Sequence, residues 1–91
     1  MNYSELTDLE INKLVNKKRT GKESIFVFDY CNNPSYSWPI ILENGISINA
    51  PDYFNDPENG HGVDTFDTPM IRDKNPLRAA MIVYLMMNKE A

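Results

Sequence analysis

The chain reads NPLRAAMIVYLMM from Asn75 to Met87, and this stretch says more about the fold than any other. Asn75 can cap the free backbone N–H groups of a helix. Pro76 suits the first helical position because its φ is fixed and it has no N–H to leave unpaired. The apolar run predicts a helix from Pro76 to about Asn88 with little polar surface. Such a helix is either buried centrally or covered on one side by another subunit.

Two more helices are predicted upstream. Asn33-Pro34-Ser35 repeats the same opening, which predicts a helix from Pro34 to about Glu43 that stops at Asn44-Gly45. Pro39 lies inside it, so we expect a kink or an irregular first turn. Thr7-Asp8-Leu9-Glu10 fits a capping box at the start of a first helix, and Gly21 is suited to end that helix in a left-handed conformation.

The strands are predicted from β-branched and aromatic composition. Residues Ser24–Tyr30 have the composition of a strand buried on both faces, and Ile46–Ile48 form a short alternating stretch. Val63–Phe66 and Met70–Arg72 are weaker candidates. Residues 50–62 read as a long acidic loop. We therefore expect an α+β fold, in which three helices pack with a small sheet of three to four strands as an α/β sandwich. The helix between the first two strands could form a βαβ crossover.

Length and charge narrow the class of protein. With 91 residues, a single domain spans residues 1–91. Nine acids and one base lie between residues 23 and 73, which disfavours binding of nucleic acid through a broad basic face. The Lys17–Arg19 cluster is expected to be a solvated helix end. The longest apolar stretch, Ala79–Met87, is far shorter than the ~20 residues of a membrane-spanning helix. The single cysteine cannot form an internal disulfide, which favours a reducing cytoplasm.

Several motifs resemble the NinX family of small proteins from lambdoid phages and prophages. They are Asn2-Tyr3-Ser4-Glu5-Leu6, Asp29-Tyr30-Cys31-Asn32-Asn33-Pro34, Trp38-Pro39-Ile40-Ile41 and Asn75-Pro76-Leu77-Arg78-Ala79-Ala80-Met81-Ile82-Val83. Residues 50–72 carry no part of the resemblance. The resemblance implies a phage or prophage gene product in the host bacterial cytoplasm, with an α/β sandwich fold. It implies no reaction.

One corner of the chain could hold a ligand. Tyr30, Asn32, Asn33 and Trp38 lie where a strand ends and a helix begins, and free N–H groups beside aromatic rings and amides suit an anionic or nucleotide-like ligand. The more ordinary interpretation is that Asn33 caps the helix, Trp38 fills the core, and the other two complete the turn. On that interpretation Trp38 and Tyr84 are largely buried.

Catalytic and metal sites have weaker support, and we expect no enzyme and no cofactor. Cys31 and His61 would be needed for a Cys–His hydrolase, but Cys31 follows a buried strand and His61 lies between two glycines in a loop. The carboxylates from Asp56 to Asp67 are spaced somewhat like a calcium loop. The required glycine and the bidentate glutamate are missing, so no metal site is expected.

We therefore expect a non-enzymatic phage accessory protein of unknown molecular activity, which binds a host or phage protein or associates with itself. The expected interface comprises Ile82, Met86 and Met87 on the last helix, most simply in a homodimer. The alternative is sequestration of a nucleotide-like ligand in host counter-defence. Nucleic acid and membrane are not expected partners.

Overall fold

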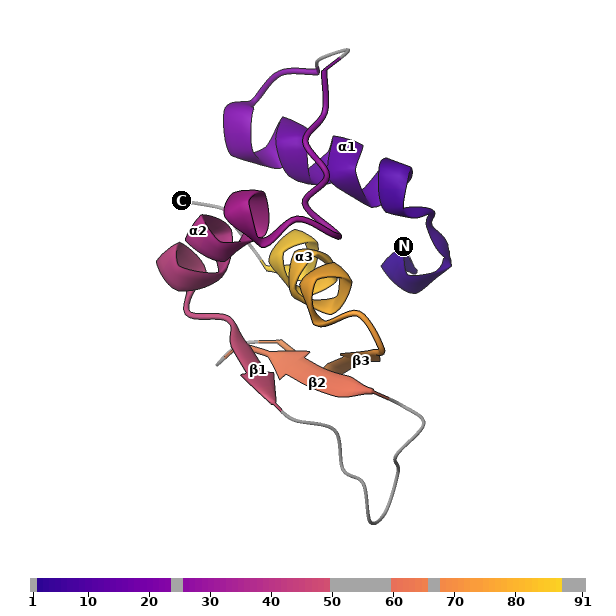
Figure 1. Ribbon diagram of the computed structural model, residues 1–91, viewed down its shortest axis with the longest axis vertical. Coiled ribbons are helices and arrows are strands. Elements are labelled where there is room, and N and C mark those ends of the chain that lie inside the picture. Colours follow the sequence, from indigo (N-terminus) through magenta and orange to yellow (C-terminus); the bar gives the residue numbers. More distant parts are fainter. Residues whose placement is uncertain (1, 24–25, 50–59, 66–67, 88–91) are drawn as a thin grey trace.

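Three helices and a three-stranded antiparallel sheet form the computed structural model, which describes residues 2–23, 26–49, 60–65 and 68–87 (Figure 1). The predicted α+β class is confirmed. The elements in chain order are the 3₁₀ helix η1 (Tyr3–Glu5), α1 (Asp8–Thr20), α2 (Pro34–Asn44), β1 (Ser47–Asn49), β2 (His61–Asp64), β3 (Ile71–Asp73) and α3 (Pro76–Met86).

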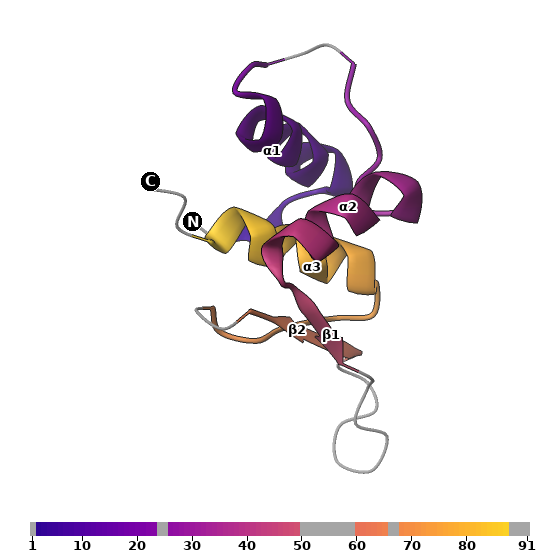
Figure 2. The same ribbon diagram turned by 90° about the vertical axis from the view of Figure 1, so that its left-hand side faces the viewer.

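Helix α3 lies at the centre of the fold. It contacts α1, α2 and all three strands, and Figures 1 and 2 show α1 on one side of it, the sheet on the opposite side and α2 beside it. Six consecutive residues, Ala79–Tyr84, are buried, as was expected for Tyr84. Of the two predicted alternatives, central burial within the chain is therefore the one observed.

This arrangement corrects the expected interface. Ile82 is only 1% exposed because the chain itself covers it, so the prediction that it lies on an uncovered side of the helix is wrong. Met86 and Met87 are partly buried and pack against the core. The apolar circumference of α3 is thus explained without a second subunit, and the reason to expect a dimer through this helix no longer holds.

The predicted helix ends are confirmed. Thr7 and Glu10 form the reciprocal capping box of α1, with N···O distances of 3.0 and 3.1 Å. The hydrogen bond that the Glu10 carboxylate accepts from the Thr7 backbone lowers the pKa of Glu10. Gly21 and Gly45 end α1 and α2 with positive φ angles of 77° and 63°. Asn33 and Asn75 cap α2 and α3 with their side-chain oxygens, as the shared Asn-Pro opening predicts.

The sheet has the strand order β1-β2-β3 and covers α3 with one face. The register aligns Ile48 with Val63 and Val63 with Ile71 across the three strands. All three side chains belong to the core or pack against it. Gly62, next to Val63, belongs to the opposite face, where the side chain of Met70 lies so close that an added Cβ would be 2.6 Å from its sulfur.

The predicted strand Ser24–Tyr30 is wrong. Residues 24–25 are outside the described part of the chain, and residues 26–29 have no regular secondary structure. Phe26 and Phe28 are exposed, and instead of pairing with a strand this segment is bonded to side chains of α1. The three described strands lie across α3 from α1 (Figure 1), so none of them lies beside this segment. The predicted βαβ crossover needed this strand and is therefore not observed.

Smaller expectations have mixed outcomes. Helix α2 runs without interruption through Pro39, and the carbonyl of Asn33 accepts bonds from the N–H groups of both Tyr36 and Ser37. His61 belongs to β2 rather than to a loop, so the predicted loop 50–62 ends too late; its residues 50–59 lie outside the described residues. The strands predicted at Val63–Phe66 and Met70–Arg72 are observed as β2 and β3.

The basic end of α1 is not simply solvated. The ammonium group of Lys18 donates hydrogen bonds to the carbonyl oxygens of Tyr84 and Met87 and lies 4.4 Å from the centroid of the Tyr84 ring. A cation at the last carbonyls of α3 compensates the negative end of its dipole. Arg19 lies 3.6 Å from the carboxylate of Glu43 on α2. These two neighbouring residues therefore fasten α1 to the C-terminal ends of the other two helices.

Arg78, near the start of α3, links this helix to α1 on one side and to β3 on the other. Its guanidinium bonds Asp8 of α1 at 2.6 Å and Asp73 of β3 at 3.2 Å. It also donates to the carbonyl oxygens of Ser4 and Leu6, at 3.1 and 2.6 Å. The side chain is only 14% exposed. One arginine thus satisfies two carboxylates and two backbone carbonyls in a largely buried place.

We predict that Arg78→Met lowers the free energy of unfolding by about 3 kcal/mol, because two carboxylates lose their cation and two carbonyls lose a donor. Urea denaturation followed by circular dichroism measures this. Arg72→Met, on the exposed side of β3, is the matched control and should stay within about 0.5 kcal/mol of wild type. Equal stability of the two variants would contradict the prediction.

Candidate functional site

The predicted ligand corner is used by the fold itself. The hydroxyl of Tyr30 is buried and donates to Asn16 Oδ1 at 3.1 Å, and burial raises the pKa of Tyr30. The side chain of Asn33 accepts from the N–H of Ser35 at 3.0 Å, which occupies the start of α2. The structure therefore uses the Tyr30 hydroxyl, both polar atoms of Asn32 and the Oδ1 of Asn33 for bonds within the chain.

A network of amide side chains surrounds Asn32. Its Nδ2 donates to Asp8 and Asp29, both at 3.1 Å, and its Oδ1 accepts from Asn75 Nδ2 at 3.0 Å. Asn75 also donates to the carbonyl of Cys31 at 2.7 Å, while the N–H of Cys31 donates to Asn12 Oδ1 at 3.0 Å. The turn at residues 29–33 is thereby fixed between α1 and the start of α3. Sequence analysis missed Asp8, Asn12 and Asn75 as members of this network.

Cys31 and His61 have different partners in the structure. The thiol is fully buried, with its sulfur 3.8 Å from the carbonyl oxygen of Asp8. Burial, reinforced by the negative charge of Asp8, raises the pKa of Cys31 to about 12. His61 Nδ1 lies instead 3.3 Å from the carbonyl oxygen of Asn49 on β1. A buried thiol with a raised pKa is a poor nucleophile.

Trp38 lies at the surface. The expectation that it fills the core is wrong, because half of it (50%) is exposed. The core side of α2 is taken by Ser37, Ile40 and Ile41, and Trp38 is turned about 100° from Ser37 around the helix. Leu42, one turn after Trp38, is 64% exposed. Helix α2 therefore carries large apolar side chains on its solvent side as well as on its core side.

We define the α2 outer face as Tyr36, Trp38, Pro39 and Leu42, all of which are exposed. At 100° per residue these positions span an arc of about 160° around the helix. Figure 2 is viewed from the side on which α2 lies in front of α3. Ser35 and Glu43 are exposed polar residues within this arc, and Glu43 is the only charged residue of α2, so the solvent side has less polar cover than is typical of a surface helix.

Stacked rings extend this face toward α1. Phe28 stacks on Tyr36 with the ring centroids 4.5 Å apart and the planes inclined by 24°. Both meet the buried Tyr30 edge-on, with centroids at 6.1 and 6.4 Å. Contacts of this kind between aromatic rings hold the two exposed rings in a fixed arrangement. The α2 outer face is thus continuous with a preformed aromatic surface.

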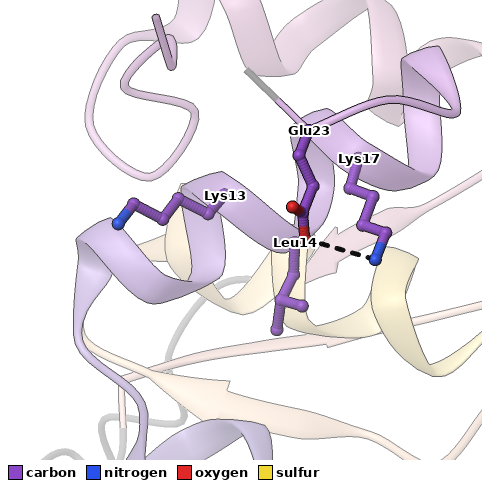
Figure 3. A pocket seen from close by; sticks show the side chains of 4 residues that line it. All are labelled: Lys13, Leu14, Lys17 and Glu23. Atoms are coloured by element: carbon purple, nitrogen blue, oxygen red, sulfur yellow. Dashed lines mark hydrogen bonds and ion pairs between the residues drawn. The ribbon is translucent and has the colours of Figure 1, made fainter. Parts of the chain in front are cut away.

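The surface hollows lie elsewhere. One of about 310 Å³ is formed by Lys13, Leu14 and Lys17 of α1 together with Glu23, and Figure 3 shows the ion pair between Lys17 and Glu23, 3.4 Å long. Both partners of this pair are well exposed, so it contributes little to stability. An adjoining hollow of about 350 Å³ adds Leu6 and Glu10. Lysines and glutamates alternate around both hollows, which gives no single ligand chemistry.

A third hollow, of about 500 Å³, lies where the C-terminal ends of the helices meet. It is lined by Lys18, Arg19, Glu43, Asn44 and Tyr84. Its cations already bind the carbonyls of α3 and the carboxylate of Glu43. Within the residues that the structure describes, no group of three or more potential ligands is placed to hold a metal ion. The carboxylates Asp52, Asp56, Glu58 and Asp67 lie outside those residues.

The α2 outer face was the feature that sequence analysis missed. The signal was present, since apolar residues occupy positions 36, 38, 39, 40, 41 and 42 and so surround the helix. The last helix has the same apolar pattern and is buried on all sides. Helix α2 is buried on one side and exposed on the other. Among the described residues, no helix is long and apolar enough to cross a membrane.

Comparison with known proteins gives one result. The model of the family described as "Bacteriophage P22, NinX" matches residues 2–88, which is nearly the whole chain. No curated protein and no solved structure gives a match. The matched range includes the Asp29–Pro34 turn, the α2 outer face and the Asn75–Arg78 segment.

We predict that Cys31 resists alkylation by iodoacetamide in the native protein at neutral pH and reacts rapidly in urea, because it is buried and its pKa is raised. Mass spectrometry of timed samples measures this. The unfolded thiol ionises near its ordinary pKa of 9.0 and the folded one near 12, so the unfolding free energy should fall as the pH rises between these values. Complete native labelling within minutes would contradict the prediction.

Proposed function

We propose that this chain, which belongs to the bacteriophage P22 NinX family, is a phage accessory protein that acts without catalysis by binding another protein. The partner is a host or phage protein, and binding takes place in the cytoplasm of the host bacterium. The observation that carries the proposal is the α2 outer face. A large exposed apolar patch on a small protein is typical of a binding surface.

The composition of the face supports protein binding in particular. Trp and Tyr contribute more than other residues to the affinity of protein interfaces, where their large rings fill pockets on the partner. Trp38 and Tyr36 are both exposed, and the stack on Phe28 holds Tyr36 in place before any partner arrives. The loss of conformational entropy when Tyr36 is ordered in a complex is therefore smaller than for a flexible side chain.

The residues that anchor α2 to the core are different from those that form the α2 outer face. Ser37, Ile40 and Ile41 anchor α2 to the core, whereas Trp38 and Leu42 lie largely outside it. Residues 26–49 contain no Lys or Arg, so attraction of nucleic acid or of an anionic membrane to this surface is not proposed. Sequestration of a nucleotide at the Asn32 corner has less support, because the polar groups there are already bonded within the chain.

We predict that a photo-crosslinking amino acid at position 42 captures one specific protein in infected cells, because Leu42 lies on the α2 outer face. The same amino acid at position 9 should not capture it. Leu9 is the matched control, since it is an exposed leucine (56%) on α1 rather than α2. Mass spectrometry identifies the captured protein. Capture of the same proteins from both positions, or of none from position 42, would contradict the proposal.

A second measurement separates binding from folding. Trp38→Ser in a protein that carries the crosslinker at position 42 should abolish capture, because it removes the largest ring of the face. The Leu42→Gln variant without a crosslinker should keep its unfolding free energy within about 1 kcal/mol of wild type, because residue 42 is mostly exposed. A larger loss would show that Leu42 supports the core.

A further inference from the structure

The α2 outer face is bordered by carboxylates and not by cations. The sequence has no Lys or Arg between residues 23 and 71, a stretch that contains eight Asp and Glu. Among residues 26–49, the charged ones are Asp29, beside the aromatic stack, and Glu43, at the end of α2. Both are exposed. The apolar face is therefore bordered by two exposed carboxylates, one of which, Glu43, shares an exposed ion pair with Arg19.

Three of the four cations of α1 already have partners within the chain. Arg19 is the basic residue paired with α2, and its guanidinium already lies 3.6 Å from Glu43. Lys17 is paired with Glu23, and Lys18 is directed to the carbonyls at the end of α3. Asp29 accepts hydrogen bonds from Asn12 and Asn32, whose amides are neutral and bring no positive charge.

The exposed rings are suited to bind cations. The face of an aromatic ring attracts a guanidinium or ammonium group, most strongly in Trp. This protein uses such a contact internally, where Lys18 lies over the ring of Tyr84. Trp38, Tyr36 and Phe28 are exposed. Glu43 lies on the same helix as the first two of these rings, and Asp29 follows Phe28 in the chain. Rings and carboxylates together form the usual surroundings of an interfacial arginine.

Building on the proposed function, we infer that the partner docks on the α2 outer face through a basic protein segment, in which arginine or lysine alternates with apolar residues. A second copy of this chain is a poor occupant. A two-fold contact through α2 would place Glu43 and Asp29 of both copies at one interface, where Arg19 is already paired with Glu43 and residues 26–49 supply no Lys or Arg for Asp29. A phosphate backbone is repelled by the same carboxylates.

Trp38 is the only tryptophan of the chain, so its fluorescence reports directly on the face. The probe is a short amphipathic helical peptide with leucines on one side and flanking arginines. It is compared with two matched peptides in which citrulline or glutamate replaces each arginine. We expect the arginine peptide to change the Trp38 emission and to bind at least about tenfold more tightly than the citrulline peptide, with affinity that falls as salt is added.

Variants of the protein locate the effect. Glu43→Gln should weaken binding of the arginine peptide several-fold, while Glu5→Gln, which removes the same charge from the exposed η1 helix, should leave it unchanged. Equal binding of the arginine and citrulline peptides overturns the inference, as does failure of all three to bind at about 1 mM. So does sedimentation as a dimer that Trp38→Ser dissociates. None of these results requires that crosslinking at position 42 fail, so the two proposals fail separately.

Discussion

The guanidinium of Arg78 is the contact on which the arrangement of the layers depends. It binds Asp8 at the start of α1 and Asp73 at the end of β3, and it donates to two carbonyls that precede α1. These partners lie on both sides of α3 and far apart in the sequence. Arginine suits the position because its rigid, permanently charged group offers several donors in one plane. Lysine has a single ammonium group and could not reach all four acceptors.

The start of α3 organises a second set of contacts through Asn75. This residue caps its own helix with its oxygen and donates with its nitrogen to Cys31 and Asn32. The turn at residues 29–33 lacks regular secondary structure, so its buried backbone groups need side-chain partners, which Asn12 and Asn75 supply. The position of α2 beside α3 follows from this turn. Helix α2 then packs on one side only, and Trp38 and Leu42 remain outside.

The candidate site was only partly accessible from the sequence. The Asp29–Pro34 motif was correctly recognised as a structural corner, and its ordinary interpretation as cap and turn is supported for Asn33 and Asn32. Trp38 was misplaced because composition alone cannot tell which side of an apolar helix meets the core. Only the packing of Ser37, Ile40 and Ile41 decides that. The stack of Phe28 on Tyr36 joins two segments that no local pattern relates.

The helix ends could be predicted from local sequence, because caps such as Thr7–Glu10, Asn33 and Asn75 are contacts between residues two or three positions apart. Whether an extended segment becomes a strand depended on the packing of distant elements, because a strand needs a neighbour to pair with. Residues 26–29 have the composition of a strand but lie on the opposite side of α3 from the sheet. The burial of a helix is likewise decided by distant elements. Both α2 and α3 are apolar on all sides, but the chain surrounds α3 and leaves one side of α2 exposed.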